Sequence, residues 1–380
     1  MVDFFAPCPR GLEKLLADEL AAFGAGGVRL TDGGVGFSGD WPLCYRANLH
    51  SRLASRILWR VATKDYRNEQ DIYDTVFNLP WGDWFDVSRT IRVKVTAIKS
   101  PLKSLDFTTL KIKDAVCDKF RKLCGERPSV DTHNPDVRIH AFLEYDRMML
   151  YVDTSGDALF KRGVRQHTNI APIRENLAAG ILTLAGWQPG IPLLDPMCGS
   201  GTFLIEAAQM SLNIAPGIGR HFAFEKLKNF DAPTWAKLRA DALTAQKPVT
   251  ELPIFGSDLY GDELKAAHYN LEEAGIRPTV ELNQANVLEI SAPAAHGILV
   301  ANLPYGERMG ERAELEALYP KLGDLLKQKF SGWNAYLFTA DLQMPKFIRL
   351  SVSRRTPLFN GALECRLFEY RIVAGSNRDS

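Results

Sequence analysis

Two short stretches of this 380-residue sequence end an apolar run with polar residues that could bind a ligand. In the first, residues 191–194 precede a carboxylate, Asp195, and a turn that contains Gly199 and Gly201. In the second, an apolar run ends at Asn302. Glycine lets the backbone approach a ligand closely, and parallel strands end at the crevice where α/β folds bind cofactors. The two stretches therefore indicate a cofactor site.

The first stretch has the pattern of a buried strand, a turn and a helix. After Thr202 the apolar residues Phe203, Ile205, Ala208 and Leu212 recur at helical spacing. Such a unit begins a doubly wound α/β sheet, although the turn by itself is compatible with any α/β strand–turn–helix.

A dinucleotide site fits this turn poorly. Such a site needs a third glycine, where this chain has Leu204, and an acidic residue about 20 residues further on. The next acid at a strand end, Asp258, lies far beyond that spacing. The turn suits a cofactor that has no pyrophosphate.

Taken together, the two stretches resemble a known enzyme family. Residues 194–208, LDPMCGSGTFLIEAA, and residues 302–308, NLPYGER, are similar to the THUMP-containing class I RNA guanine-N2 methyltransferases, which depend on S-adenosylmethionine. The similarity is strongest to the guanine-N2 half of the bacterial 23S rRNA large-subunit enzymes. It runs nearly end to end, through residues 10–13, 51–56, 171–175 and 332–334.

The resemblance implies an α/β fold with a Rossmann-like methyltransferase domain at 173–380, built on a seven-stranded, mostly parallel sheet. It implies two α+β lobes before that domain, a ferredoxin-like lobe at 1–64 and a THUMP RNA-binding domain at 65–155. A linker at 156–172 joins the two parts.

By the same resemblance, Asp195 lines the methionine part of S-adenosylmethionine and Asp258 accepts from both ribose hydroxyls. Asn286 lies where the family usually has an aspartate for the adenine amine, and an amide oxygen can still accept from that amine. The remaining cofactor-binding residues form the turn: Pro196, Cys198, Gly199, Ser200, Gly201 and Thr202.

The second stretch supplies the expected catalytic residues Asn302, Leu303, Pro304 and Tyr305. The Asn302 side-chain oxygen and the Leu303 carbonyl would accept from the target amine, and Tyr305 would stack on the flipped base. Most relatives have proline where this chain has Leu303, which bears on the stiffness of the loop.

These assignments predict methylation of the N2 amine of a guanine in 23S rRNA or its precursor particle. Two alternatives remain open. The same motif serves an adenine-N6 methyltransferase on DNA or RNA, and the chain could be a non-catalytic RNA-binding ribosome-assembly factor. A pyrimidine-C5 enzyme is disfavoured, because no cysteine lies between Cys198 and Cys365.

Composition indicates a globular protein with no membrane segment, since 46% of residues are hydrophobic and 24% charged. The six cysteines form no C-x-x-C pair and the seven histidines no metal-binding pattern. We therefore expect a cytoplasmic monomer without a metal.

Basic residues are concentrated in one region. Residues 87–127 contain eleven Lys or Arg and four Asp or Glu. For this region the alternative to RNA contact is a solvated basic helix face, and for the linker at 156–172 it is a plain surface linker. The candidate RNA-binding residues are Lys99, Lys103, Lys111 and Lys113, with Arg162 and Arg165 in the linker.

Three further predictions concern individual elements. Residues 43–58 have a helical pattern with Arg46, Arg52, Arg56 and Arg60 on its polar side. The insertion at 214–250 is expected to cover the methyltransferase sheet, with contact to substrate as the alternative. Strands near 347–350 and 364–373 are expected to form an antiparallel hairpin at the edge of that sheet.

Overall fold

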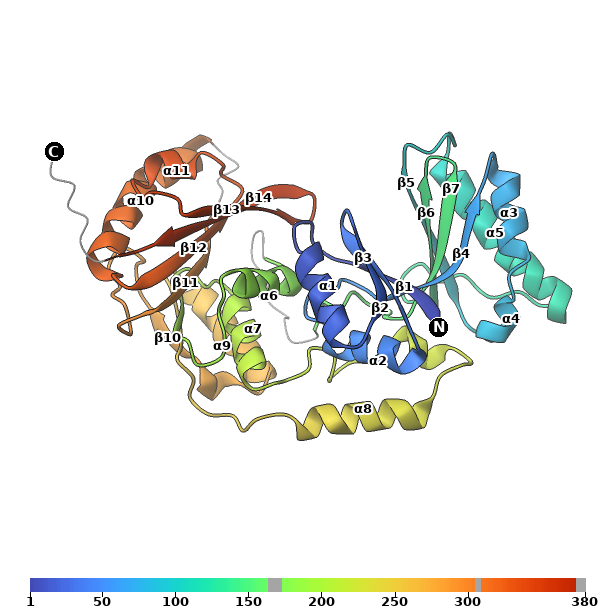
Figure 1. Ribbon diagram of the computed structural model, residues 1–380, viewed down its shortest axis with the longest axis horizontal. Helices are drawn as coiled ribbons and strands as arrows, with labels where there is room; N and C mark the ends of the chain where they lie inside the picture. The colour runs from blue at the N-terminus through green and yellow to red at the C-terminus, as the bar shows by residue number, and fades with distance from the viewer. Residues whose placement is uncertain (163–172, 305–308, 374–380) are drawn as a thin grey trace. The chain divides into compact units, whose positions relative to one another are not determined.

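The computed structural model describes residues 1–162, 173–304 and 309–373, with the side chains of 309–312 left out (Figure 1). The chain forms two compact units. The N-terminal unit contains Met1–Pro7, Leu16–Leu159 and Gly219–Asp241. The C-terminal unit contains Cys8–Leu15, Phe160–Ile218 and the chain from Ala242 onward.

The N-terminal unit contains one sheet of seven strands in the order β2-β3-β1-β4-β7-β6-β5. The strands are β1 (Val2–Pro7), β2 (Gly26–Thr31), β3 (Gly34–Gly39), β4 (Leu58–Asp65), β5 (Ile91–Ile98), β6 (Val137–Glu144) and β7 (Arg147–Asp153). The helices are α1 (Glu13–Ala22), α2 (Trp41–His50), α3 (Glu69–Phe77), α4 (Trp81–Trp84) and α5 (Leu105–Cys124). Because β4 pairs with β1 on one side and with β7 on the other, aligning Leu58 with Asp153, the two predicted N-terminal lobes share a single sheet.

The predicted helix over 43–58 is too long. Helix α2 ends at His50, and β4 begins at Leu58. The Glu19 carboxylate accepts hydrogen bonds from the Ser51 hydroxyl at 2.6 Å and the Arg52 N–H at 2.9 Å. Because the Arg52 N–H donates to Glu19 of α1 and not to a carbonyl of α2, helix α2 does not continue through this residue.

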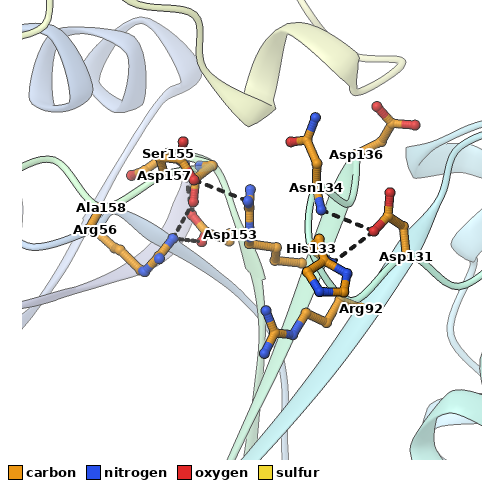
Figure 2. A network of polar contacts seen from close by, with 12 residues as sticks. Arg56, Arg92, Asp131, His133, Asn134, Asp136, Asp153, Ser155, Asp157 and Ala158 are labelled. Carbon is orange, nitrogen blue, oxygen red and sulfur yellow. Dashed lines mark hydrogen bonds and ion pairs between the residues drawn. The ribbon is translucent and has the colours of Figure 1, made fainter. Parts of the chain in front are cut away.

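Arg56, predicted on a helix, instead binds a buried carboxylate. Its guanidinium pairs with Asp153 at the end of β7 (Figure 2). Asp153 Oδ1 also accepts from the Ser155 N–H at 2.8 Å. Asn48 of α2 donates to Thr154 Oγ1 at 2.9 Å, and its oxygen accepts from Ser155 Oγ at 2.6 Å. Residues 153–155 therefore join α2, β7 and the segment that precedes β4.

Residues 219–241, most of the insertion, belong to the N-terminal unit, so the prediction that the insertion covers the methyltransferase sheet is wrong for these residues. Residues 219–241 contain a 3-10 turn (Ala223–Lys226) and most of helix α8 (Ala232–Thr244). The Tyr45 ring of α2 lies 4.5 Å from that of Phe224 and 6.2 Å from that of Trp235. Arg220 donates to the Asp157 carbonyl at 2.6 Å. The packing of residues 219–241 therefore depends on residues that are distant in sequence.

We expect Trp235→Ala to lower the free energy of unfolding by about 3–5 kcal/mol, because it removes a large ring packed against other aromatic rings. Trp235 is only 5% exposed. Denaturant unfolding of the whole chain measures the change. Lys237→Ala, on the exposed side of α8, should change it by less than about 0.5 kcal/mol. Equal stability of the two variants would contradict the packing role.

The C-terminal unit contains a second seven-stranded sheet, in the order β10-β9-β8-β11-β12-β14-β13. The strands are β8 (Leu193–Asp195), β9 (Ile254–Asp258), β10 (Glu281–Gln284), β11 (Gly297–Asn302), β12 (Trp333–Thr339), β13 (Arg354–Asn360) and β14 (Leu363–Arg371). The helices include α6 (Glu175–Leu184), α7 (Thr202–Ser211), α9 (Gly261–Glu273), α10 (Met309–Lys329) and α11 (Met344–Phe347). The first five strands are parallel and β14 is antiparallel to both neighbours, so the predicted mostly parallel sheet is confirmed.

The C-terminal hairpin is present, but its first strand is β13, and the predicted strand over 347–350 is wrong. Residues 344–347 form α11 instead. Helix α10 approaches this segment so closely that a Cβ on Gly323 would lie 1.7 Å from the Ile348 carbonyl oxygen. Ile348 is fully buried there. None of the described helices is long and apolar enough to cross a membrane.

Candidate active site

Three polar residues end neighbouring parallel strands at one edge of the C-terminal sheet. Asp195 ends β8, Asp258 ends β9 and Asn302 ends β11. The registers align Asp195 with Gly256 on one side of β8, and Leu194 with Leu299 on the other. The strand order reverses between β8 and β11, which is where open α/β sheets bind ligands. The structure thus brings together the two stretches that the sequence singled out.

The glycine turn is held against β9 by backbone contacts. Gly199 and Gly201 have φ angles of +49° and +83°, a region that side chains disfavour. The Gly199 N–H donates to Asp258 Oδ2 at 2.9 Å, and the Cys198 N–H donates to the Ser257 carbonyl at 2.9 Å. Asp258 Oδ1 accepts from the Tyr260 N–H at 3.0 Å. One carboxylate therefore holds both loops.

Asp195 is a buried carboxyl group. It is 2% exposed, and its Oδ1 accepts from the Met197 N–H at 3.2 Å. No described residue forms an ion pair with it. Burial, with a smaller contribution from the charge of Asp258, raises the pKa of Asp195 from 3.8 to about 8. A cation bound beside this group would favour its ionised form.

We expect Asp195→Asn to stabilise the ligand-free protein at alkaline pH. Because the folded-state pKa of about 8 lies above the unfolded value of 3.8, wild-type stability falls as pH rises from about 4 to about 8. An amide does not ionise. At pH 8.5 the variant should be more stable by at least about 1–2 kcal/mol, and the difference should shrink toward pH 5. Thermal unfolding at both pH values measures this, and a difference independent of pH would contradict it.

Asn302 presents an unused acceptor. Its Oδ1 is buried and has no hydrogen-bond partner among the described residues. The next residue, Leu303, is 1% exposed, and its N–H donates to the Phe338 carbonyl of β12 at 2.9 Å. Pro304 is exposed. Tyr305, predicted to stack on a base, lies outside the described residues.

The other predicted cofactor residues lie in the glycine turn, except Asn286, which lies in the loop after β10. Cys198 is 6% exposed and burial raises the pKa of its thiol well above the ordinary value, which disfavours the reactive thiolate. The Ser200 carbonyl accepts from Asn270 Nδ2 at 3.1 Å, while Pro196 contacts Ser257 and Thr202 begins α7. Asn286 Oδ1 accepts from the Leu288 N–H at 3.0 Å, which leaves it a second lone pair.

Two residues that the sequence reasoning missed support the turn. Asn270 of α9 is fully buried and holds the Ser200 carbonyl. A Cβ on Gly256 would lie 2.4 Å from a Leu204 methyl. Leu204 occupies the position of the third glycine, and Gly256 on β9 leaves the space that the Leu204 side chain needs. Gly256 within an apolar run was the available signal.

The predicted RNA-binding residues are dispersed. Lys99 follows β5 and Lys103 precedes α5, whereas Lys111 and Lys113 lie on α5. The predicted RNA contact of Arg162 is corrected, because its side chain is 4% exposed and pairs with Glu206 at 2.6 Å within the C-terminal unit. We no longer assign it to RNA. Arg165 lies outside the described residues, and in the described part of the chain no His, Cys, Asp and Glu cluster could hold a metal.

Three families match successive parts of the chain. Residues 3–58 match the RlmL ferredoxin-like domain and residues 66–153 match the THUMP domain. Residues 162–369 match the RMKL-like methyltransferase domain. The last match covers more than half of the chain and contains all of the residues described above as the candidate site.

Two curated relatives differ in length. A Synechocystis sp. protein, provisionally named an RNA methyltransferase, is 38% identical over 97% of this chain and 96% of its own length. The ribosomal RNA large subunit methyltransferase K/L of Aeromonas salmonicida is 38% identical over 99% of this chain and 55% of its own length. This chain therefore spans about half the length of the K/L relative.

Two solved structures share the whole fold. SMU.472, provisionally described as a methyltransferase and solved in complex with SAH, has a TM-score of 0.89 at 29% identity, over 99% of each chain. A Listeria monocytogenes protein, described from its sequence as an N6-adenine-specific DNA methylase, has a TM-score of 0.88 at 28% identity. The match covers 98% of this chain and 96% of that protein.

Proposed function

Because this chain belongs to the RMKL-like methyltransferase family and uses S-adenosylmethionine, we propose that it methylates the exocyclic N2 amine of a guanine in 23S rRNA. The substrate is either free 23S rRNA or a precursor particle. The name of the K/L relative and the THUMP match support an rRNA substrate. We propose further that the protein acts as a monomer in the cytoplasm.

One observation carries the proposal. The side-chain oxygen of Asn302 is buried, has no partner among the described residues, and lies at the strand order reversal beside the glycine turn. A buried acceptor without a donor costs about 1–3 kcal/mol, so such a group is retained for a ligand that donates to it. An amine N–H is a donor of the required kind.

The residues of the glycine turn fit S-adenosylmethionine. When bound, this cofactor supplies a methyl group activated on a positively charged sulfur. Asp195, buried with no described cationic partner, suits the positively charged methionine part. Asp258 is proposed to accept from the ribose hydroxyls, and Asn286 to accept from the adenine amine. Gly199 and Gly201 adopt the positive φ angles of the turn, which lets its backbone approach the ligand.

The acceptor loop is proposed to orient the target amine. Asn302 Oδ1 and the Leu303 carbonyl each accept one N–H of the N2 amine, which directs the nitrogen lone pair toward the methyl group. The nitrogen gains the methyl and loses one proton to solvent. The guanine must leave its stack to enter the crevice, and Pro304 and Tyr305 are proposed to hold the flipped base. Lys99, Lys103, Lys111 and Lys113 are proposed phosphate contacts.

Nucleoside mass spectrometry tests the proposal. The purified chain is incubated with S-adenosylmethionine and 23S rRNA, or large-subunit precursor particles, from a strain that lacks it. We expect new N2-methylguanosine. Appearance of N6-methyladenosine would replace the proposal with the adenine-N6 alternative, which the description of the Listeria protein favours. No methylation, together with no S-adenosylmethionine binding in calorimetry, would favour the non-catalytic assembly factor.

A further inference from the structure

One face of the N-terminal sheet has the features of a nucleic-acid surface. Buried side chains alternate along β6, with Ile139, Ala141 and Leu143 on the face toward α5. Figure 1 shows α3 and α5 on the same side of these strands. On the other face, no helix described in this unit covers β5, where Arg92, Lys94 and Thr96 are exposed.

The strand registers arrange this open face in rows. Lys94 of β5 aligns with His140 of β6, His140 aligns with Tyr151 of β7, and Tyr151 aligns with Arg60 of β4. Paired residues point to the same side of a sheet, so this row alternates cationic, imidazole and aromatic groups across four strands. The Arg60 guanidinium lies 5.8 Å from the Tyr151 ring centroid.

Part of the positive charge on this face is left unpaired by the protein, although Arg138 pairs with Asp157 at 3.2 Å and His140 lies 3.5 Å from the Asp153 carboxylate. Among the described residues, Lys94 and Arg92 form no ion pair; Arg92 donates to the Thr132 carbonyl at 2.8 Å. Arg60 also lacks a carboxylate partner in the part of the chain that the structure describes, and its Nε is buried without a hydrogen bond. Unpaired cations on a common face attract phosphates.

Aromatic rings lie among these cations. Phe142 of β6 is half-buried and aligns with exposed Thr96 on β5 and half-buried Met149 on β7. Phe5 of β1, also half-buried, lies 5.9 Å from the Tyr151 ring. A basic surface with rings on which bases stack suits single-stranded nucleic acid. A flat sheet cannot enter the deep, narrow major groove of an RNA duplex.

We propose that this open face, formed by Arg92, Lys94, Phe142 and Phe5, with Arg60 held over the buried Tyr151 ring, binds a single-stranded segment of the substrate RNA. Arg92 and Lys94 contact phosphates, and Phe142 stacks on a base. The inference rests on the proposed RNA substrate, but concerns a surface that is distinct from the lysines of α5.

Fluorescence anisotropy with the full chain tests this surface. The probe is a labelled, unstructured RNA of about 16 nucleotides, compared with a duplex of the same length. Arg92→Ala/Lys94→Ala should raise the Kd for the single strand about tenfold and reduce the slope of log Kd against log salt by about 1.4. Phe142→Ala should raise the Kd about tenfold with the salt slope unchanged, because stacking carries no charge.

Three controls keep the result interpretable. Arg67→Ala/Lys237→Ala removes two exposed cations of the same unit elsewhere and should leave the Kd within about twofold. Phe142→Leu keeps an apolar side chain without the ring and should reproduce the loss even if Phe142→Ala unfolds. S-adenosylmethionine affinity, measured by calorimetry, should stay unchanged in every variant.

Unchanged RNA affinity in the Arg92→Ala/Lys94→Ala and Phe142→Leu variants would overturn the inference. A loss confined to Lys111→Ala/Lys113→Ala would do the same and assign the RNA to α5. Equal or tighter binding of the duplex would also overturn it. Failure of the proposed function is a separate outcome, since it appears in the nucleoside analysis and leaves binding of this probe unaffected.

Discussion

Asn302→Ala is expected to lower the rate of methyl transfer by about 10²–10³-fold at saturating S-adenosylmethionine and RNA, as removal of one orienting group does in other active sites. Asn302 Oδ1 is buried and unpaired among the described residues, and the substrate amine is its proposed donor. Without it, the amine lone pair is no longer directed at the methyl group. Single-turnover rates, with cofactor affinity from calorimetry, measure the effect.

Control variants distinguish a loss of substrate orientation from a loss of protein folding. Asn302→Asp keeps an acceptor at the same position and should retain more activity than the alanine variant. Asn283→Ala, on exposed β10, should be neutral. Cofactor affinity of Asn302→Ala should stay within a few-fold of wild type. A normal transfer rate in Asn302→Ala would remove the acceptor role.

Asp258→Ala is expected to weaken S-adenosylmethionine binding by about 100-fold or more. Its carboxylate holds the Gly199 N–H at 2.9 Å and the Tyr260 N–H at 3.0 Å, and it is the proposed ribose acceptor. Hydrogen bonds to a charged group contribute about 1.5–3 kcal/mol each, so losing the ribose contact and the loop anchor together gives this magnitude. Isothermal calorimetry measures the affinity.

The matched control is Asp262→Ala, four residues along the chain in the first turn of α9. Asp262 is exposed and pairs with Lys265 at 2.8 Å, away from the glycine turn. It should bind S-adenosylmethionine normally. If both variants lost affinity equally, a general destabilisation of α9 would explain the loss, and the specific role of Asp258 would be rejected.

The central strand–turn–helix unit was predictable because its signals are local. The apolar run before Asp195, the two glycines that need positive φ, and the helical spacing after Thr202 all lie within about two dozen residues. Parallel strands of one sheet end at the same edge. The predicted association of Asp195 with Asn302 therefore followed from the pattern, and the register of β8 with β11 agrees with it.

Contacts between distant segments were not predictable from local pattern. Arg162 follows a basic surface pattern, yet it is buried against Glu206, a partner 44 residues away. Residues 219–241 were predicted to cover the sheet of the methyltransferase domain, yet their aromatic rings pack on Tyr45 of α2. In both cases the sequence offers several surfaces of similar chemistry on which the residues could pack. Only the free energy of burial in the folded chain decides between these surfaces.

By itself the sequence determined the class of fold and predicted the roles of the cofactor loop and the acceptor motif, because periodicity, glycine positions and motif spacing are properties of neighbouring residues. The tertiary structure decided that the two N-terminal lobes share one sheet, that Asn302 Oδ1 has no described partner, and which basic residues stay exposed. These properties depend on which side chains meet across the fold, and burial of a charge or an acceptor is defined only once they have met.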